Sequence, residues 1–254
     1  MDWVGQCAVV IPCRNEAASI GEIVSAVRRQ LPSVIVVDDG STDGTADRAI
    51  AVGAETLRHP TQQGKGAALR TGWQRARECG FAWALAMDGD GQHAPEDISA
   101  FLACAETTGA ALVIGNRMDH ANAMPWLRRQ VNRWMSRRLS NLAGVRLPDS
   151  QCGFRLVNLQ ALSRVQLAAQ RFEVESEMLV VFLAARCKVE FIPVQVIYKS
   201  QSSKIHPLWD TWRWFRWWRA QRRKSYPVLP SSSFSSSSSM SCGWVRERGR
   251  GGGQ

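Results

Sequence analysis

Two aspartates separated by one glycine are the strongest candidates for chemistry in this sequence. Asp88 and Asp90 stand in Asp88-Gly89-Asp90-Gly91-Gln92-His93, directly after the apolar run 82–87. Paired carboxylates at a strand end suit Mg²⁺ or Mn²⁺, which prefer oxygen ligands and complete their coordination shell with substrate phosphates. A plain turn is the alternative, because Asp and Gly dominate turns. An EF-hand is disfavoured, since the glycine and glutamate that its loop needs are not correctly spaced after Asp90.

Two further polar clusters also follow apolar runs. Pro12-Cys13-Arg14-Asn15-Glu16 closes the run 7–12, and Asp38-Asp39-Gly40-Ser41 closes 34–37. In an open parallel sheet, ligands bind beyond the carboxyl ends of the strands. Three such clusters on one rim therefore predict a ligand site. The cluster Asp38-Asp39-Gly40-Ser41 could hydrogen-bond a base or ribose; alternatively, it forms only a loop and a helix cap.

Glycine-rich phosphate loops are not supported. Gly64-Lys65-Gly66 is followed by Ala, so the P-loop pattern is absent, and no G-x-G-x-x-G opens the first helix. A dinucleotide cofactor is accordingly disfavoured.

The elements that must position these clusters alternate along the first half of the chain. Strands are predicted over 7–12, 34–37, 54–58, 82–87 and 111–115. Helices are predicted over 16–30 with Asn15 as N-cap, from Thr42 or Asp43 to Val52, over 65–79 and over 95–107. This alternation predicts an α/β fold, with a mostly parallel sheet and helices on both faces.

After residue 120 the pattern changes. A basic helix over 126–143, a loop over 144–155, a helix over 174–186, a strand over 188–197 and a Trp/Arg-rich helix over 207–224 are predicted. Residues 225–254 are largely Ser, Arg and Gly and predict a disordered tail. The expected organisation is one domain over 1–206, the helix 207–224 and the tail.

Composition points to an anionic partner. The 254 residues carry a net charge of +10, and 45% of them are hydrophobic. The start resembles no signal peptide, and no apolar run reaches the ~20 residues of a membrane span. We expect a cytoplasmic protein, peripheral on the cytoplasmic membrane face, that depends on a membrane-protein partner if it needs an anchor.

An ordered set of motifs resembles a known family. VIPCRNEAASI, VVDDGSTDGT, GKGAALRTG, AMDGDGQH, GNR and DSQCGFR occur between residues 7 and 218 in the order of the family 2 glycosyltransferases with a GT-A fold. Among these, the chain is most similar to the dolichyl- or polyprenyl-phosphate glycosyltransferases.

The resemblance implies a nucleotide-sugar donor and a divalent metal, Mg²⁺ or Mn²⁺. It implies that the nucleotide pocket is lined by Pro12, Arg14, Glu16, Val37 and Asp39. The donor diphosphate would meet Asp88, Gly89 and Asp90 through the metal, which Gln92 joins. Arg117 would face a donor or acceptor phosphate, and Lys204 would lie near the diphosphate.

Two positions depart from the family pattern. Arg14 stands where many members have Tyr, which leaves the preferred base open. Ile197 stands where many have Arg; Lys199 is a weaker substitute, since it cannot grip phosphate bidentately.

The implied reaction is a single inverting displacement. A hydroxyl acceptor needs a general base, for which Asp149 is the first candidate and Glu175 and Glu177 the second. Asp149 alternatively accepts backbone N–H bonds and fixes its loop. A phosphate acceptor is already ionised and needs cations instead, available from Arg117, Arg128, Arg129 and Arg133.

The two basic helices bear on the acceptor. At ~100° per residue, helix 207–224 gathers Trp214, Phe215, Trp217 and Trp218 on one side and Arg213, Arg216, Arg219 and Arg223 opposite. This suits an anionic membrane surface and a lipid-phosphate acceptor. The alternative is that the Trp side packs on the domain and the Arg side is solvated.

Two other classes of function fit less well. A sugar nucleotidyltransferase needs a Gly- and Arg-rich loop after the first strand, where this chain has CRNEAAS. A nucleic-acid binder would suit the Arg/Trp clusters, but acidic strand ends repel phosphates without a metal. We therefore expect no nucleic-acid partner.

Overall fold

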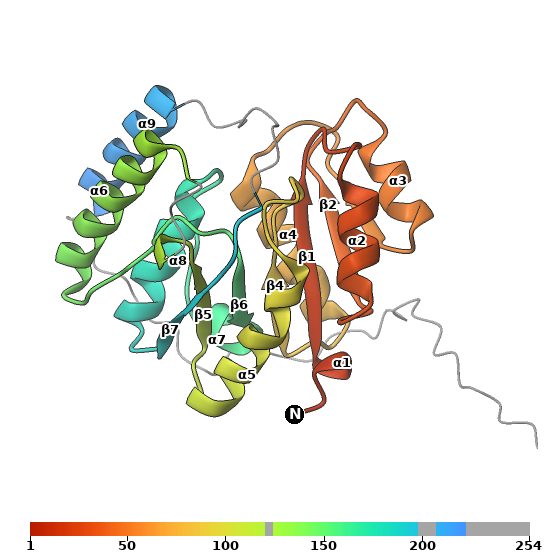
Figure 1. Cartoon of the computed structure of the whole chain (residues 1–254), viewed down its shortest axis with the longest axis horizontal. Helices are drawn as coiled ribbons and strands as arrows, with labels where there is room; N and C mark the ends of the chain where they lie inside the picture. Colours follow the sequence, from red (N-terminus) through yellow and green to blue (C-terminus); the bar gives the residue numbers. More distant parts are fainter. Residues whose placement is uncertain (120–123, 198–206, 222–254) are drawn as a thin grey trace, which may run out of the picture.

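The strands form one mixed sheet with a single reversed member. A computed structural model describes residues 1–119, 124–197 and 207–221 (Figure 1). The sheet order is β3-β2-β1-β4-β6-β5-β7, and β6 alone runs antiparallel to its neighbours β4 and β5. The strands are β1 (Cys7–Cys13), β2 (Val34–Asp38), β3 (Glu55–Arg58), β4 (Trp83–Ala86), β5 (Leu112–Asn116), β6 (Arg155–Asn158) and β7 (Val189–Pro193). The predicted, mostly parallel α/β sheet is confirmed.

Helices cover both faces of this sheet, as predicted. In Figure 1, α2 and α5 lie in front of the strands and α4 lies behind them. The helices are α1 (Trp3–Gln6), α2 (Ile20–Arg28), α3 (Thr45–Ala51), α4 (Lys65–Glu78), α5 (Ile98–Thr108), α6 (Trp126–Ala143), α7 (Leu159–Ser163), α8 (Glu173–Ala184) and α9 (Pro207–Gln221), with a 3₁₀ turn over Pro95–Asp97. Within the described part of the chain, no helix combines the length and apolarity needed to cross a bilayer.

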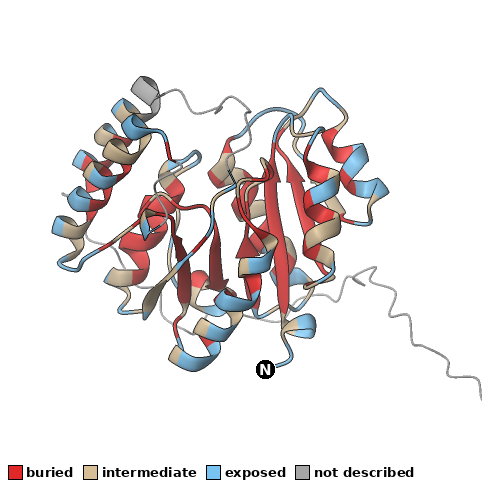
Figure 2. Ribbon diagram, in the orientation of Figure 1, coloured by how far each residue is buried: buried red, intermediate tan, exposed pale blue. Residues whose placement is uncertain are grey.

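The core lies between the central strands and the helices. Every residue of β1, β2 and β4 is buried, because helices cover both sides of them (Figure 2). Helix α4 packs close against β1, since a Cβ on Gly72 would lie only 2.3 Å from Cγ1 of Val10. The continuous apolar runs of these strands follow from burial on both faces.

The sequence did not predict β6, α7 or the short α1. Residues 144–155 were expected as a loop, and β6 begins at the end of that segment. The alternation of strands and helices gives no reason for the chain to return antiparallel into the middle of the sheet. This return places the loop after Asp149 next to the end of β4.

The N-cap expected at Asn15 is wrong. Helix α2 begins at Ile20, and Asn15 has a positive φ of 53°. Its backbone N–H donates to Ser41 Oγ (2.8 Å), and its Oδ1 accepts from the N–H of Thr42 (2.9 Å). Asn15 therefore ties the loop after β1 to the loop after β2, at the rim where the predicted site lies.

Candidate active site

The segment Asp88-Gly89-Asp90 lies at the carboxyl end of β4, beside the end of β1. A Cβ on Gly89 would lie 2.9 Å from Cβ of Cys13 and 3.6 Å from Cγ of Glu16, so only glycine fits between the two strand ends. The hydroxyl of Ser19 donates to the carbonyl of Gly89 (2.8 Å) and fixes the turn. The cluster after β1 (residues 12–16) and the cluster after β4 (residues 88–93) thus lie together, as predicted.

Lys65 joins two carboxylates at this rim. Its Nζ lies 2.6 Å from Asp88 Oδ1 and 2.6 Å from Glu175 Oε1. Burial works against the charge of Lys65, but the two carboxylates outweigh it and raise the pKa of the ammonium. Burial likewise favours neutral Asp88, yet Lys65, followed by His93 and Arg117, lowers its pKa to about 2. Asp88 is therefore a carboxylate at neutral pH.

The sequence assigned no role to Lys65. The segment Gly64-Lys65-Gly66 lacks the P-loop pattern and belongs to the family motif GKGAALRTG, but neither observation gave Lys65 a role. The available signal was its position at the start of a helix that faces the rim. Gly153 completes this contact: a Cβ there would lie 2.7 Å from Asp88 Oδ2 and 2.8 Å from Lys65 Nζ. The DSQCGFR segment thereby reaches the aspartate pair.

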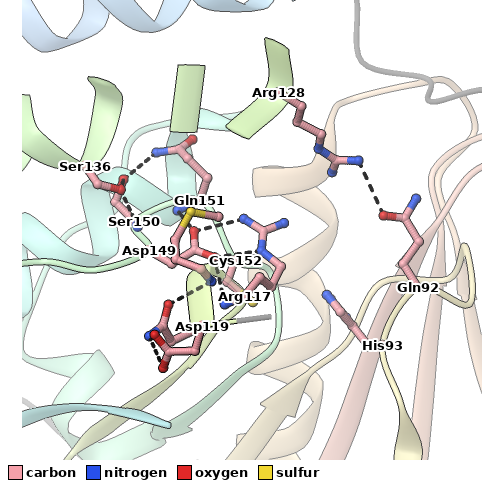
Figure 3. A network of polar contacts seen from close by, with 12 residues as sticks. Gln92, His93, Arg117, Asp119, Arg128, Ser136, Asp149, Ser150, Gln151 and Cys152 are labelled. Carbon is pink, nitrogen blue, oxygen red and sulfur yellow. Dashed lines mark hydrogen bonds and ion pairs between the residues drawn. The ribbon is translucent and has the colours of Figure 1, made fainter. Parts of the chain in front are cut away.

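Asp90, Gln92 and His93 form the second half of the turn. Asp90 Oδ1 accepts from the N–H of Gln92 (3.0 Å), and Gln92 Oε1 lies 3.5 Å from Arg128 Nη1 on α6 (Figure 3). The buried His93 accepts from the N–H of Asp88 (3.2 Å) and stacks on Phe154, with ring centroids 5.0 Å apart. Its Nδ1 is thereby the unprotonated nitrogen, and the ring supports the turn from below the rim.

The oxygen atoms of this turn fit a hard divalent cation. Two carboxylates and one amide oxygen are the donors that Mg²⁺ and Mn²⁺ prefer, and such sites use few protein ligands beside substrate phosphates. Among the described residues, no cluster of three or more His, Cys, Asp or Glu side chains could hold a metal alone. A donor diphosphate would therefore have to supply the remaining oxygens.

Arg117 and Asp149 form a buried, bidentate ion pair. Arg117 Nε and Nη2 donate to Asp149 Oδ2 (2.7 Å) and Oδ1 (2.9 Å), and the N–H of Arg117 also donates to Oδ2 (3.2 Å) (Figure 3). Asp149 has no exposed surface. Burial opposes ionisation of Asp149, but Arg117 outweighs it and lowers the pKa of the carboxyl. This geometry suits an anchor for Arg117 better than a proton acceptor that must reach substrate.

The other two candidate bases are also engaged. Glu175 is 5% exposed and holds Lys65, while Glu177 Oε2 accepts from the N–H groups of Ala168 (2.9 Å) and Ala169 (2.7 Å). Both glutamates thus have a structural use in α8.

Of the residues expected around the nucleotide, some are buried in the fold and others are exposed at the rim. Pro12 and Val37 are buried partners in neighbouring strands, and Arg14 is exposed at the rim. Asp39 is 5% exposed, and its carboxylate accepts from His59 Nδ1 and from the N–H groups of Gln63 and Gly64, each at 2.8 Å. Asp39 therefore fixes the loop that leads to Lys65. Lys204 lies outside the described residues, as does Lys199.

The aromatic side of α9 packs on the domain. Trp214 and Trp218 are 3% and 7% exposed, and Trp214 Nε1 donates to Ser176 Oγ on α8 (2.8 Å). The Trp214 ring meets Trp134 of α6 edge-on, with centroids 5.5 Å apart. The sequence left open whether the Trp side of this helix faces a membrane or packs on the domain. Trp214 and Trp218 pack on the domain and are therefore not available to a membrane.

The sequence is similar to those of known glycosyltransferases. A 222-residue alignment gives 29% identity to a UDP-N-acetylglucosamine–dolichyl-phosphate N-acetylglucosaminyltransferase of Methanococcus voltae, covering 76% of this chain and 86% of the relative. A polyprenol monophosphomannose synthase of Mycolicibacterium smegmatis is 31% identical over 63% of this chain and 64% of its own.

The fold resembles that of a solved glycosyltransferase. Glucosyl-3-phosphoglycerate synthase from Mycobacterium tuberculosis, in complex with Mn²⁺, UDP-glucose and phosphoglyceric acid, superposes with a TM-score of 0.66 at 20% identity, covering 85% of this chain and 79% of that one. The chain thus has the GT-A fold. Residues 8–165 match the model of glycosyl transferase family 2, and the chain belongs to that family.

Proposed function

We propose that this glycosyltransferase moves a sugar, with inversion, from a nucleotide-sugar donor to a polyprenyl phosphate, and that it needs Mg²⁺ or Mn²⁺ to do so. The observation that carries the proposal is the Arg117–Asp149 pair: a fixed guanidinium, 6% exposed, whose carboxylate partner is fully buried and accepts through both oxygens, so that it is not placed to act as a base. A phosphate acceptor is already ionised and needs a cation to bind it, whereas a hydroxyl acceptor needs a general base to take its proton.

The donor side of the site follows from the aspartate turn. Asp88, Asp90 and Gln92 would hold the metal, which would neutralise charge developing on the leaving diphosphate. Lys65 keeps Asp88 ionised and in place, and Glu175 in turn orients Lys65. Arg14, Glu16 and the exposed edge of the loops after β1 and β2 would meet the nucleotide, and Lys204 would approach its diphosphate.

The acceptor side follows from Arg117 and α6. Asp149 holds the guanidinium of Arg117 in one orientation, so little side-chain entropy is lost when it meets an anion. Arg128 approaches the same turn through Gln92 (3.5 Å) and offers a second cation. Relatives named for dolichyl- and undecaprenyl-phosphate acceptors support this substrate class.

Such an acceptor places the enzyme at a membrane. We propose peripheral attachment on the cytoplasmic face, through anionic lipids and, as a second means, a membrane-protein partner. The relatives' lipid-linked acceptors support attachment to a membrane.

The test is a donor screen in detergent. Nucleoside diphosphate release from a panel of UDP- and GDP-sugars is followed with Mn²⁺ or Mg²⁺, and with undecaprenyl phosphate, undecaprenol or no acceptor. We expect release only with the phosphate and only without chelator. Equal release with undecaprenol would show that a hydroxyl is the acceptor and would contradict the proposal.

A further inference from the structure

Helices α6 and α9 form a two-helix layer at one end of the molecule (Figure 1). They run in the same direction, because Trp134 lies against Trp214 (5.5 Å between centroids) and, one turn further along both helices, Arg138 lies 5.5 Å from the Trp218 ring. Their inner sides are buried against the domain at Asn132, Met135, Ser136, Leu139, Trp214 and Trp218. The outer sides have no such cover among the described residues.

Each outer side carries one tryptophan followed by arginines. At ~100° per residue, Trp126, Arg133 and Arg137 share one side of α6, and Trp212, Arg216 and Arg219 share one side of α9. All six side chains are exposed, Trp126 by 65% and Trp212 by 53%. We call these six residues the outer patch. Helix α6 contains no acidic residue and α9 contains one, Asp210, so the arginines of the two helices outnumber their acidic residues and the layer carries a net positive charge.

The same layer forms a wall of the active site. Arg128 of α6 reaches Gln92, and Ser136 of α6 accepts from the N–H of Ser150 (3.0 Å) (Figure 3). Trp214 of α9 and Gln151 both donate to Ser176 Oγ, at 2.8 and 2.9 Å. The helices that carry the outer patch on their outer sides therefore contact, through their inner sides, the loop that carries Asp149 and its neighbour Ser176.

We propose that the outer patch binds the anionic headgroup layer of a lipid bilayer and so brings the site to its acceptor; this inference rests on the proposed lipid-phosphate acceptor. Unbalanced arginines complement anionic headgroups, and the amphipathic Trp ring suits the boundary between headgroups and acyl chains. Nucleic acid fits less well, because base stacking needs an open ring face, and Arg216 lies over the Trp212 ring at 5.2 Å.

The test is sedimentation of the full chain with vesicles. We expect binding to vesicles of phosphatidylcholine with phosphatidylglycerol, little binding to phosphatidylcholine alone, and weakening by added salt. The variant Arg133→Gln/Arg137→Gln/Arg216→Gln should bind about tenfold or more weakly. The matched control Arg29→Gln/Arg77→Gln/Arg164→Gln removes the same charge from exposed positions on α2, α4 and beyond α7, and should bind as the wild type. Trp126→Ala/Trp212→Ala should weaken binding, whereas Ile50→Ala, exposed on α3, should not.

Three results would overturn the inference: no preference for anionic vesicles, equal loss in the control triple, or displacement of the protein from vesicles by single-stranded oligonucleotide at equal charge. Transfer to a short, water-soluble prenyl phosphate separates it from the proposed function. If transfer persists without vesicle binding, only the surface is wrong. If vesicle binding persists but no prenyl phosphate is glycosylated, the proposed acceptor is wrong and the surface stands.

Discussion

At the scale of single residues, the Arg117–Asp149 pair is expected to contribute strongly to stability. Because Asp149 is fully buried and bonded to Arg117 through both oxygens, its replacement leaves an uncompensated cation in the interior. We expect Asp149→Asn to lower the free energy of unfolding by about 3 kcal/mol at pH 7, as measured by urea denaturation.

The pH dependence of the free energy of unfolding tests whether the ion pair with Arg117 is the source of this stabilisation. The pKa of Asp149 is lowered from the ordinary 3.8 by Arg117, so its stabilisation is complete above that value and is lost as pH falls through the lower, folded-state pKa. The gap between wild type and Asp149→Asn should therefore narrow below about pH 4. A gap that stayed constant into acid would show that the pair is not its source. Arg117→Ala/Asp149→Ala should be no less stable than Asp149→Ala alone.

Gly153 is the second test at this scale. Its replacement by Ala pushes on the ends of two flexible side chains, Asp88 and Lys65, and so should disturb the site more than the fold. We expect Gly153→Ala to reduce the transfer rate by about 10- to 100-fold with little change in melting temperature. Gly21→Ala, whose Cβ would meet only Val52 at 3.9 Å, is the control. Full activity of Gly153→Ala would contradict the proposal that the Lys65–Asp88 contact is needed for transfer.

The sequence located the aspartate turn but not its supports. The place of Asp88 and Asp90 at the end of β4 could be predicted because its signal is local, at the end of an apolar run. Gln92 was added by the family resemblance, and the metal role of all three residues stays a prediction. Lys65 could not, since its role comes from contact with Glu175, which is distant in the chain. Asp39 was expected at the nucleotide, whereas its carboxylate accepts from three N–H groups of the segment 59–64. The flanking strand and helix predict a loop there, but not its contact with Asp39.

At the scale of elements, α9 separates packing from exposure within one helix. Trp214 is buried and bonded to Ser176, while Trp212, two residues earlier, is exposed. We expect Trp214→Ala to cost about 3–5 kcal/mol of unfolding free energy, and Trp212→Ala to stay within about 0.5 kcal/mol. Thermal and urea unfolding followed by circular dichroism measure both. Equal, small effects would mean that α9 is not packed on α6 and α8.

Periodicity predicted the helices and the parallel strands well, because both carry long regular signals. It predicted the two sides of α9 but not which side is buried, since that depends on Trp134 and Ser176 in other elements. It missed β6 because this strand returns antiparallel between β4 and β5, a position that the alternation of strands and helices does not predict.

At the scale of the whole molecule, the site lies where two halves of the sheet meet. Strands β1 to β4 bring the aspartate turn and Lys65, and the reversed β6 carries the loop with Asp149 back beside them. The layer of α6 and α9 then closes the end next to Arg128 and Gln92. The alternation in the first half of the sequence predicted the strands and helices that position the aspartate turn, while the position of the Asp149 loop depends on contacts between distant segments.

The central claim is that Asp88 and Asp90 bind a nucleotide sugar's diphosphate through one divalent cation. Isothermal titration of the purified protein with UDP and GDP, in Mn²⁺ and in excess chelator, tests it most directly. We predict binding that chelator abolishes and that Asp88→Asn/Asp90→Asn lacks, while the control Glu78→Gln/Glu96→Gln, altered at exposed carboxylates outside the turn, keeps it. Equal affinity with chelator, or in the double variant of the turn, would contradict the account.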